Sequence, residues 1–155
     1  MSNTKTATFD MYALLRSVSR TFALSIEQLP ALLRETVTIA YLLFRVADCI
    51  EDHPELSREQ KARLLRLWAD IVSGNAAVEV LIHDLNNLDA SDPEVAIALR
   101  ADAILTSMHS LHAEPSRILR QHVTETALGM ARWQDHGPVS YTHLRAHETP
   151  EHLVC

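Results

Sequence analysis

Glycine and cysteine are scarce in this sequence of 155 residues, which has three glycines and two cysteines. Aromatic residues make up 5% of the chain, whereas hydrophobic residues make up 47%. An apolar composition with so little glycine favours long helices over sheets joined by tight turns. Two cysteines cannot build a disulfide framework, which predicts a reducing compartment. The length suits one domain, which we expect to be all-α.

Targeting signals, membrane spans and excess positive charge are also missing. The first eight residues, MSNTKTAT, are polar and contain no apolar signal core. The most apolar run, residues 37–50, is too short and too charged to span a membrane. A net charge of −6 argues against a nucleic-acid partner. We expect a cytoplasmic location, with peripheral membrane association left open.

Prolines and capping residues divide the sequence into predicted helices, and no strand pattern or repeat interrupts them. Ser57-Arg58-Glu59-Gln60 is a capping box that opens one helix, and Gly74 ends the same helix. Trp68 and Trp133 are expected in the core. The predicted helices cover about residues 9–28 (broken near Arg20), 30–52, 58–73, 76–88, 93–113 and 115–130.

A polar stripe runs through the second of these helices. Tyr41, Arg45, Asp48 and Asp52 are spaced by four, three and four residues, which keeps them on one helical face. The surrounding residues are almost all apolar, and a helix that is apolar nearly all round is buried. Because an unpaired buried charge costs several kcal/mol, these side chains must face one another, a metal ion or a wet cavity.

The chemistry of the stripe suits a phosphorylated ligand. Asp48 and Asp52 lie one helical turn apart, and Glu51 adds a third carboxylate, a set of oxygen ligands that suits Mg²⁺. Proteins usually hold Mg²⁺ with one or two carboxylates and the phosphate oxygens of a substrate. Arg45 can clamp a phosphate, and Tyr41 adds a hydroxyl. The stripe therefore predicts one half of a Mg²⁺–diphosphate site.

Plainer interpretations of these polar residues remain open. Arg45 and Asp48 can form an ion pair within the helix, with the acidic helix end closed at His53-Pro54. Four histidines invite a metal interpretation, but apart from one i, i+3 pair they lie on different predicted helices and lack the spacing of metal ligands. We interpret them as surface or partly buried side chains: His83, His109, His112 and His122.

Two segments resemble the squalene/phytoene synthase family, the head-to-head prenyl synthases. The run YLLFRVADCIED, residues 41–52, is similar to the first aspartate-rich motif of that family with its preceding tyrosine and arginine. The run SRTF, residues 19–22, continues as ALSIEQLP and is similar to an element that holds diphosphate and lines the cavity. The resemblance covers about residues 10–75. It implies that the chain is part of an all-α isoprenoid-synthase helical bundle.

The resemblance also implies roles for individual residues. It assigns catalysis to Tyr41, Arg45, Asp48 and Asp52, substrate binding to Ser19, Arg20, Phe22, Tyr41 and Arg45, and Mg²⁺ binding to Asp48, Glu51 and Asp52. Members of the family join two prenyl diphosphates, such as farnesyl or geranylgeranyl diphosphate, to a squalene- or phytoene-type product. NADPH would be needed only for a squalene-type product. The sequence does not choose between these products.

Other functions on related folds stay open as well. A non-catalytic assembly or scaffold relative would share the fold, but such relatives tend to lose the acidic ligands that are present here. A terpene cyclase would share aspartate-rich helices but not the element at residues 19–22. The family also needs a second aspartate-rich motif, which we do not find in this sequence. We therefore expect an N-terminal part of a larger enzyme that is inactive by itself.

The last residues differ in character from the rest. The run VSYTHLRAHET, at the start of residues 139–155, resembles the translation of a common sequencing adapter. On this interpretation residues 1–138 are the native part of the domain, and Cys49 is the only native cysteine. The alternative is a native, histidine-rich loop.

We predict that deleting residues 139–155 leaves the melting temperature of the remaining chain unchanged. The segment has no helical apolar period and was not selected to pack against the domain. Thermal denaturation of the two chains followed by circular dichroism tests this prediction. A clear loss of stability on deletion, or the same codons in genomic DNA of the source organism, would show that the segment is native.

Overall fold

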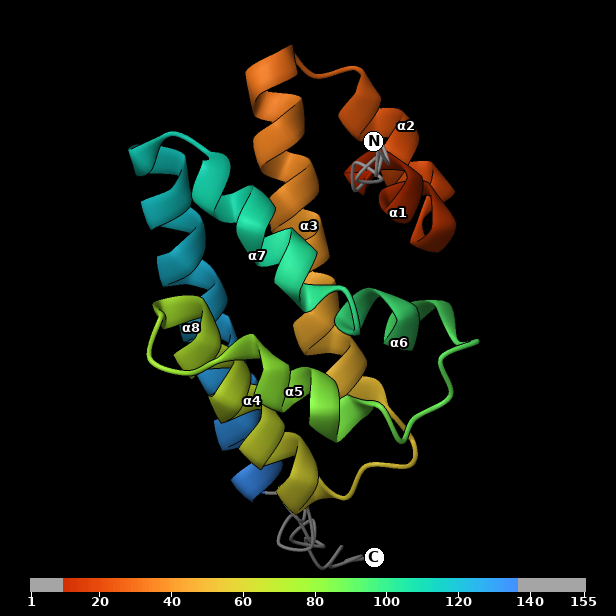
Figure 1. Cartoon of the computed structure of the whole chain (residues 1–155), viewed down its shortest axis with the longest axis vertical. Coiled ribbons are helices and arrows are strands. Elements are labelled where there is room, and N and C mark those ends of the chain that lie inside the picture. The colour runs from red at the N-terminus through yellow and green to blue at the C-terminus, as the bar shows by residue number, and fades with distance from the viewer. Residues whose placement is uncertain (1–9, 137–155) are drawn as a thin grey trace, which may run out of the picture.

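The computed structural model of the protein describes residues 10–136, and the described part consists of helices and short connections (Figure 1). The all-α prediction is therefore confirmed. The eight helices are α1 Met11–Val18, α2 Arg20–Glu27, α3 Ala31–Asp52, α4 Arg58–Ser73, α5 Val78–Leu85, α6 Pro93–Ala98, α7 Ala101–Ser110 and α8 Ala113–His136. The predicted non-native segment, residues 139–155, lies outside the described residues.

Capping side chains set several helix boundaries where the sequence predicted them. Ser19 ends α1, and its hydroxyl accepts a hydrogen bond from the Phe22 amide at the start of α2. This break falls one residue before the one expected at Arg20. Ser57 and Gln60 form the predicted capping box of α4. These short polar side chains satisfy amide groups that would otherwise lack partners at the helix starts.

The predicted helix over residues 93–113 is wrong in one respect, because the structure divides it into α6 and α7. The division lies at Leu99 and Arg100, and the chain then continues to Ser110. Neither residue is a glycine or proline, so local propensity gives no signal for this break. Both helices contact α3, and each buries its own apolar face, which requires a change of direction between them.

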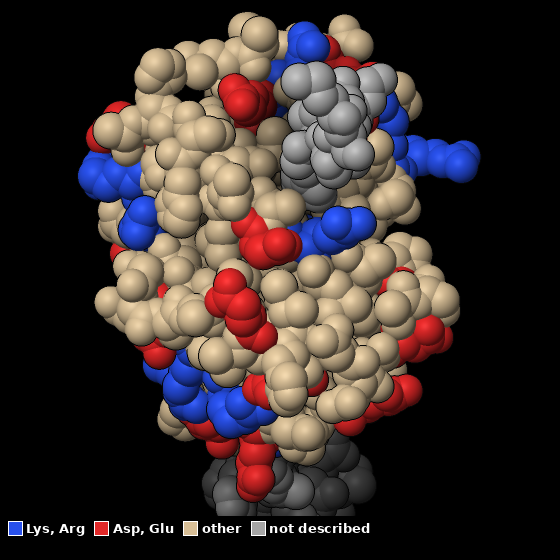
Figure 2. All heavy atoms as spheres, in the orientation of Figure 1, with Lys and Arg blue, Asp and Glu red and all other residues tan. Residues whose placement is uncertain are grey.

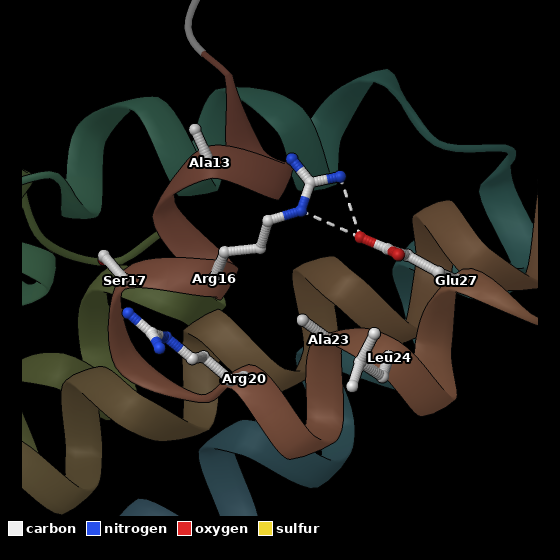
Figure 3. A pocket seen from close by; sticks show the side chains of 7 residues that line it. All are labelled: Ala13, Arg16, Ser17, Arg20, Ala23, Leu24 and Glu27. Atoms are coloured by element: carbon white, nitrogen blue, oxygen red, sulfur yellow. Dashed lines mark hydrogen bonds and ion pairs between the residues drawn. The ribbon is translucent and has the colours of Figure 1, made fainter.

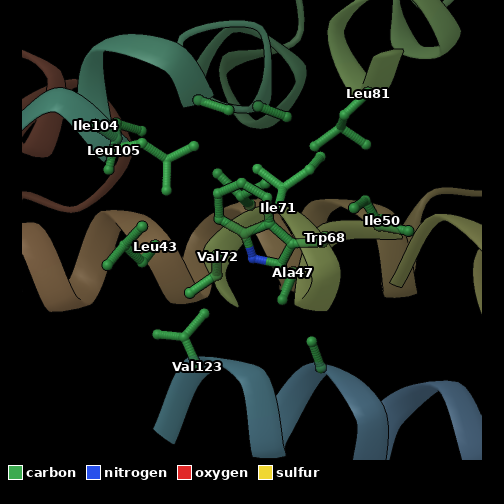
Figure 4. Close-up of a cluster of buried hydrophobic side chains, with 14 of the residues drawn as sticks. Leu43, Ala47, Ile50, Trp68, Ile71, Val72, Leu81, Ile104, Leu105 and Val123 are labelled. Carbon is green, nitrogen blue, oxygen red and sulfur yellow. The ribbon is translucent and has the colours of Figure 1, made fainter. Parts of the chain in front are cut away.

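Helix α3 runs through the middle of the helical bundle, with α1 and α2 on one side and α7 and α8 on the other (Figure 1). It contacts α1, α2, α4, α6, α7 and α8. The indole of Trp68 on α4 is fully buried beside it, as expected. Trp133 was expected in the core as well, but it is 59% exposed near the end of α8. Figure 4 shows the core around Trp68, with side chains from α3, α5, α7 and α8 that include Leu43, Ala47, Ile50, Leu81, Ile104 and Val123.

A smaller apolar cluster attaches α1 and α2 to α3. Leu15, Ala23 and Ile26 are its buried members, and Tyr41 of α3 packs against it. Tyr41 also packs against the main core, so it lies where the two clusters meet. The α1–α2 pair is thereby held beside the polar stripe of α3.

Charged side chains of both signs lie on the face of the molecule that Figure 2 shows. Figure 2 shows acidic and basic side chains interspersed with uncharged surface on the face in view. No helix among residues 10–136 is long and apolar enough to cross a membrane.

We predict opposite effects of alanine at the two glycines in the described part of the chain. Gly74 has φ of 85°, the left-handed conformation that ends α4, and Gly74→Ala should lower the free energy of unfolding by about 1 kcal/mol. An added Cβ would meet only Arg120 Nη1 at 3.5 Å, so the cost is conformational. Gly129 lies within α8, and Gly129→Ala should raise the free energy of unfolding by about 0.5–1 kcal/mol.

Urea denaturation of both variants and the unchanged chain measures these differences directly. Equal effects of the two substitutions would contradict the assigned backbone conformations.

Candidate functional site

The polar stripe of α3 lies at the edge of the core rather than inside it. The apolar side of the helix is completely buried, with Leu42, Leu43 and Val46 inaccessible to solvent. On the stripe, by contrast, the side chains of Arg45 and Asp48 are 22% and 32% exposed. The expectation that α3 is buried nearly all round is therefore wrong at the stripe, although Arg45 and Asp48 do face one another as expected. Its charged groups keep partial contact with water, which lowers the cost of placing them beside an apolar core.

Arg45 is the most highly connected residue of the stripe. Its Nη1 donates to Asp48 Oδ2 at 3.2 Å, and its Nη2 forms an ion pair with Glu94 Oε1 of α6. The intrahelical ion pair of the plainer interpretation is thus present. The Nε atom of Arg45 is buried and has no hydrogen-bond partner among the described residues. This N–H group is therefore a hydrogen-bond donor that remains unsatisfied at the site.

Glu94 is held in place by the start of α6. Asp92 caps this helix, and its Oδ1 accepts a hydrogen bond from the Glu94 amide at 2.8 Å. Pro93 occupies the first turn, where its missing N–H costs nothing. The sequence analysis missed Glu94 as a partner of the stripe. The Asp-Pro-Glu run predicts an acidic first helical turn, but only the packing of α6 on α3 brings it to Arg45.

The electrostatics at Arg45 reflect these contacts. Partial burial alone would lower the pKa of Arg45, but the negative charge of Glu94, with Tyr41 and Asp48, more than compensates and raises it. Arg45 therefore stays charged across the whole accessible pH range. The thiol of Cys49, on the neighbouring part of α3, has its pKa raised to about 12 by burial and by the charges of Glu94 and Asp92.

The end of α3 carries an excess of negative charge. The pKa of Glu51 is raised by partial burial and by repulsion from Asp52 and Asp48, which the side chain of Gln134 and the charge of Lys61 only partly offset. The carbonyl groups at a helix C-terminus disfavour negative charge in the same region. A bound cation would relieve this repulsion.

The oxygen-rich donor set fits one side of a Mg²⁺ site, but it is not a complete site. Among residues 10–136, no three His, Cys, Asp or Glu side chains come together as a group able to hold a metal ion. One of the carboxylates, that of Asp48, already forms an ion pair with Arg45. Because phosphate oxygens and water complete most Mg²⁺ sites, one or two carboxylates suffice from the protein. The predicted ligand set of Asp48, Glu51 and Asp52 therefore stays a prediction.

The second motif meets the stripe through an aromatic contact. Phe22 of α2 and Tyr41 of α3 have ring centroids 5.3 Å apart at an interplanar angle of 37°. Phe22 is nevertheless 58% exposed, so most of its ring is free to contact another molecule. The family resemblance implied that both residues belong to one site, and the structure places their rings side by side.

Ser19 and Arg20 are less directly connected to the stripe. The Ser19 hydroxyl caps α2, and Arg20 lines a hollow of about 510 Å³ between α1 and α2. Figure 3 shows the Arg16 guanidinium facing the Glu27 carboxylate across this hollow, where Arg16 Nη2 and Glu27 Oε1 are 2.7 Å apart. A second hollow of about 420 Å³, between α1 and α6, is lined by Glu94 and shares Ser17 with the first.

Comparison with known proteins identifies the family of the chain. Residues 15–147 match the squalene/phytoene synthase family, and the match extends into the segment that we interpreted as a non-native tail. The chain is 30% identical over 123 residues to a squalene synthase of Saccharomyces cerevisiae, covering 77% of this chain and 26% of the relative.

Two proteins of Botryococcus braunii are similar to a shorter stretch. A squalene synthase is 44% identical over 62 residues, covering 40% of this chain and 13% of the relative. A lycopaoctaene synthase is 39% identical over 62 residues, covering 40% of this chain and 14% of the relative. The chain thus spans between about an eighth and a quarter of the length of these relatives. With the family match over most of its length and an all-α structure, the chain belongs to the squalene/phytoene synthase family.

Proposed function

We propose that α3 and α2 form the first-aspartate-motif side of a diphosphate site in a prenyltransferase that joins two prenyl diphosphates head to head. The observation that carries this proposal is the convergence of two separate sequence motifs. Tyr41 contacts Phe22, and Arg45 and Asp48 follow on the same face of α3. Charged, hydroxyl and aromatic groups of this kind would suit a ligand with an anionic head and an apolar chain.

Each side chain would have a distinct task in this site. Arg45 and Tyr41 would bind diphosphate oxygens, since a guanidinium forms charge-assisted hydrogen bonds with phosphate. The Ser19 hydroxyl accepts the Phe22 amide hydrogen and keeps its own proton for a further diphosphate oxygen. Arg20 is exposed beside Ser19 and would add positive charge. The ring of Phe22 would line the cavity for the prenyl chain, where apolar walls keep water from a reactive carbocation.

Asp48 and Asp52, supported by Glu51, would hold Mg²⁺ when the diphosphate binds. The ion supplies charge stabilisation to the departing diphosphate.

The substrate in this proposal is farnesyl or geranylgeranyl diphosphate, and the product is of the squalene or phytoene type. The names of the relatives include squalene synthases and a lycopaoctaene synthase, so the family relationship does not select one product. NADPH enters only for a squalene-type product. A cytoplasmic enzyme with peripheral membrane association could release such an apolar product into a bilayer.

We predict that the purified chain binds inorganic pyrophosphate in the presence of Mg²⁺ and that Asp48→Asn weakens this binding about tenfold or more. The amide keeps the shape of the side chain but removes the charge that attracts the ion. Isothermal titration calorimetry measures both affinities. Asp70→Asn, at an exposed carboxylate on α4, is the matched control and should bind as the unchanged chain does. Unaltered binding by Asp48→Asn would favour a scaffold role on the same fold.

We also predict that the chain alone does not turn over farnesyl or geranylgeranyl diphosphate with Mg²⁺. Charge stabilisation must surround the leaving group before ionisation becomes fast, and α3 supplies donors from one side. Product analysis after extended incubation, with diphosphate release as a second readout, tests this expectation. Formation of a prenyl hydrocarbon or alcohol above the protein-free rate would refute it.

A further inference from the structure

Glu94 belongs to neither of the motifs that define the site, yet its carboxylate contacts the guanidinium of Arg45. We propose that Glu94 is a specificity-determining residue that competes with diphosphate for Arg45, so that the anion binds there only together with a divalent cation. This inference rests on the proposed diphosphate site and assigns a role to a residue on a different helix from the stripe.

The first argument is the occupancy of Arg45. Its two terminal nitrogens each contact a carboxylate, Asp48 within α3 and Glu94 from α6, and its Nε is buried. An incoming anion therefore meets the negative charge of both carboxylates and competes with them for this guanidinium. The free energy of breaking the existing pair is subtracted from the affinity for the ligand.

The second argument identifies which carboxylate gives way. The side chain of Glu94 is 40% exposed, compared with 32% for Asp48. Glu94 also borders the hollow of about 420 Å³ between α1 and α6, whose other lining residues are Ser17, Val18, Asp92 and Pro93. The side chain can rotate into this space while its backbone stays fixed by the bond from its amide to Asp92. Asp48 does not border this hollow, and it pairs with Arg45 one turn away on the same helix.

The third argument is the balance of charge. Asp48 and Glu94 together carry two negative charges against the single positive charge of Arg45, and Asp52 continues the stripe. A free diphosphate would approach a surface of its own sign. A divalent cation held by the carboxylates of α3 would make this surface positive and would draw Asp48 away from Arg45. Glu94 would then be the remaining competitor for Arg45, and a fully charged diphosphate could displace it.

The test measures pyrophosphate binding by isothermal titration calorimetry, once with Mg²⁺ and once with a chelator and no divalent ion. Glu94→Gln should bind metal-free pyrophosphate about tenfold more tightly than the unchanged chain, because the amide forms a weaker, uncharged contact with Arg45. With Mg²⁺ the gain should shrink to about threefold or less, because the bound cation then supplies most of the attraction for pyrophosphate. Glu94→Ala should show the same gain, and circular dichroism confirms that each variant is folded.

Two further variants make the result specific. Glu79 occupies the position in the first turn of α5 that Glu94 occupies in α6. Glu79→Gln therefore controls for the general loss of one negative charge, and its affinity for pyrophosphate should match that of the unchanged chain. The double variant Glu94→Gln with Arg45→Gln should lose the gain, because the gain depends on the freed guanidinium.

The outcomes separate this inference from the proposed function. No gain in metal-free binding for either Glu94 variant, or a gain that persists without Arg45, would overturn the role of Glu94 whatever Mg²⁺ does. Failure of the unchanged chain to bind pyrophosphate more tightly with Mg²⁺ than without it would instead count against the diphosphate site itself.

Discussion

Burial of the apolar side of α3 is the constraint on which the rest of the structure depends. Ile39, Leu42, Leu43, Val46 and Ile50 are inaccessible to solvent, and six other helices contact α3. This packing fixes the rotation of α3 about its axis. Because side chains at helical spacing share a face, fixing the apolar side also fixes where the polar stripe points. The position of the candidate site is therefore a consequence of how the core is packed.

The site balances incompatible demands of stability and binding. Partial burial raises the pKa of Glu51, repulsion from Asp52 and Asp48 raises it further, and the ion pairs of Arg45 offset part of the cost of gathering carboxylates at a helix C-terminus. Yet the same ion pairs occupy the guanidinium that an anionic ligand would need. Partial exposure of the stripe reconciles these demands, since solvent stabilises the charges in the free state and leaves them accessible to a ligand.

Periodicity and capping predicted much of the fold, because these signals depend on residues close together in the sequence. The capping box at Ser57 and the shared face of Tyr41, Arg45 and Asp48 are of this kind. The break at Leu99, the exposure of Trp133 and the Arg45–Glu94 ion pair were not predictable in this way. Each depends on which helices pack together, a tertiary property that a helical pattern does not contain. The family resemblance implied that Phe22 and Tyr41 share one site, but the contact between their rings was not predicted.

The central claim is that the acidic end of α3 and the Phe22–Tyr41 contact belong to one metal–diphosphate site. The most direct test replaces Mg²⁺ with paramagnetic Mn²⁺ in the presence of pyrophosphate and follows the backbone amide signals by nuclear magnetic resonance. The account predicts that broadening is strongest for residues 45–52, weaker for residues 19–22 and absent around Gly74 at the other end of α4. Broadening centred on another part of the surface, or none that depends on pyrophosphate, would contradict the account.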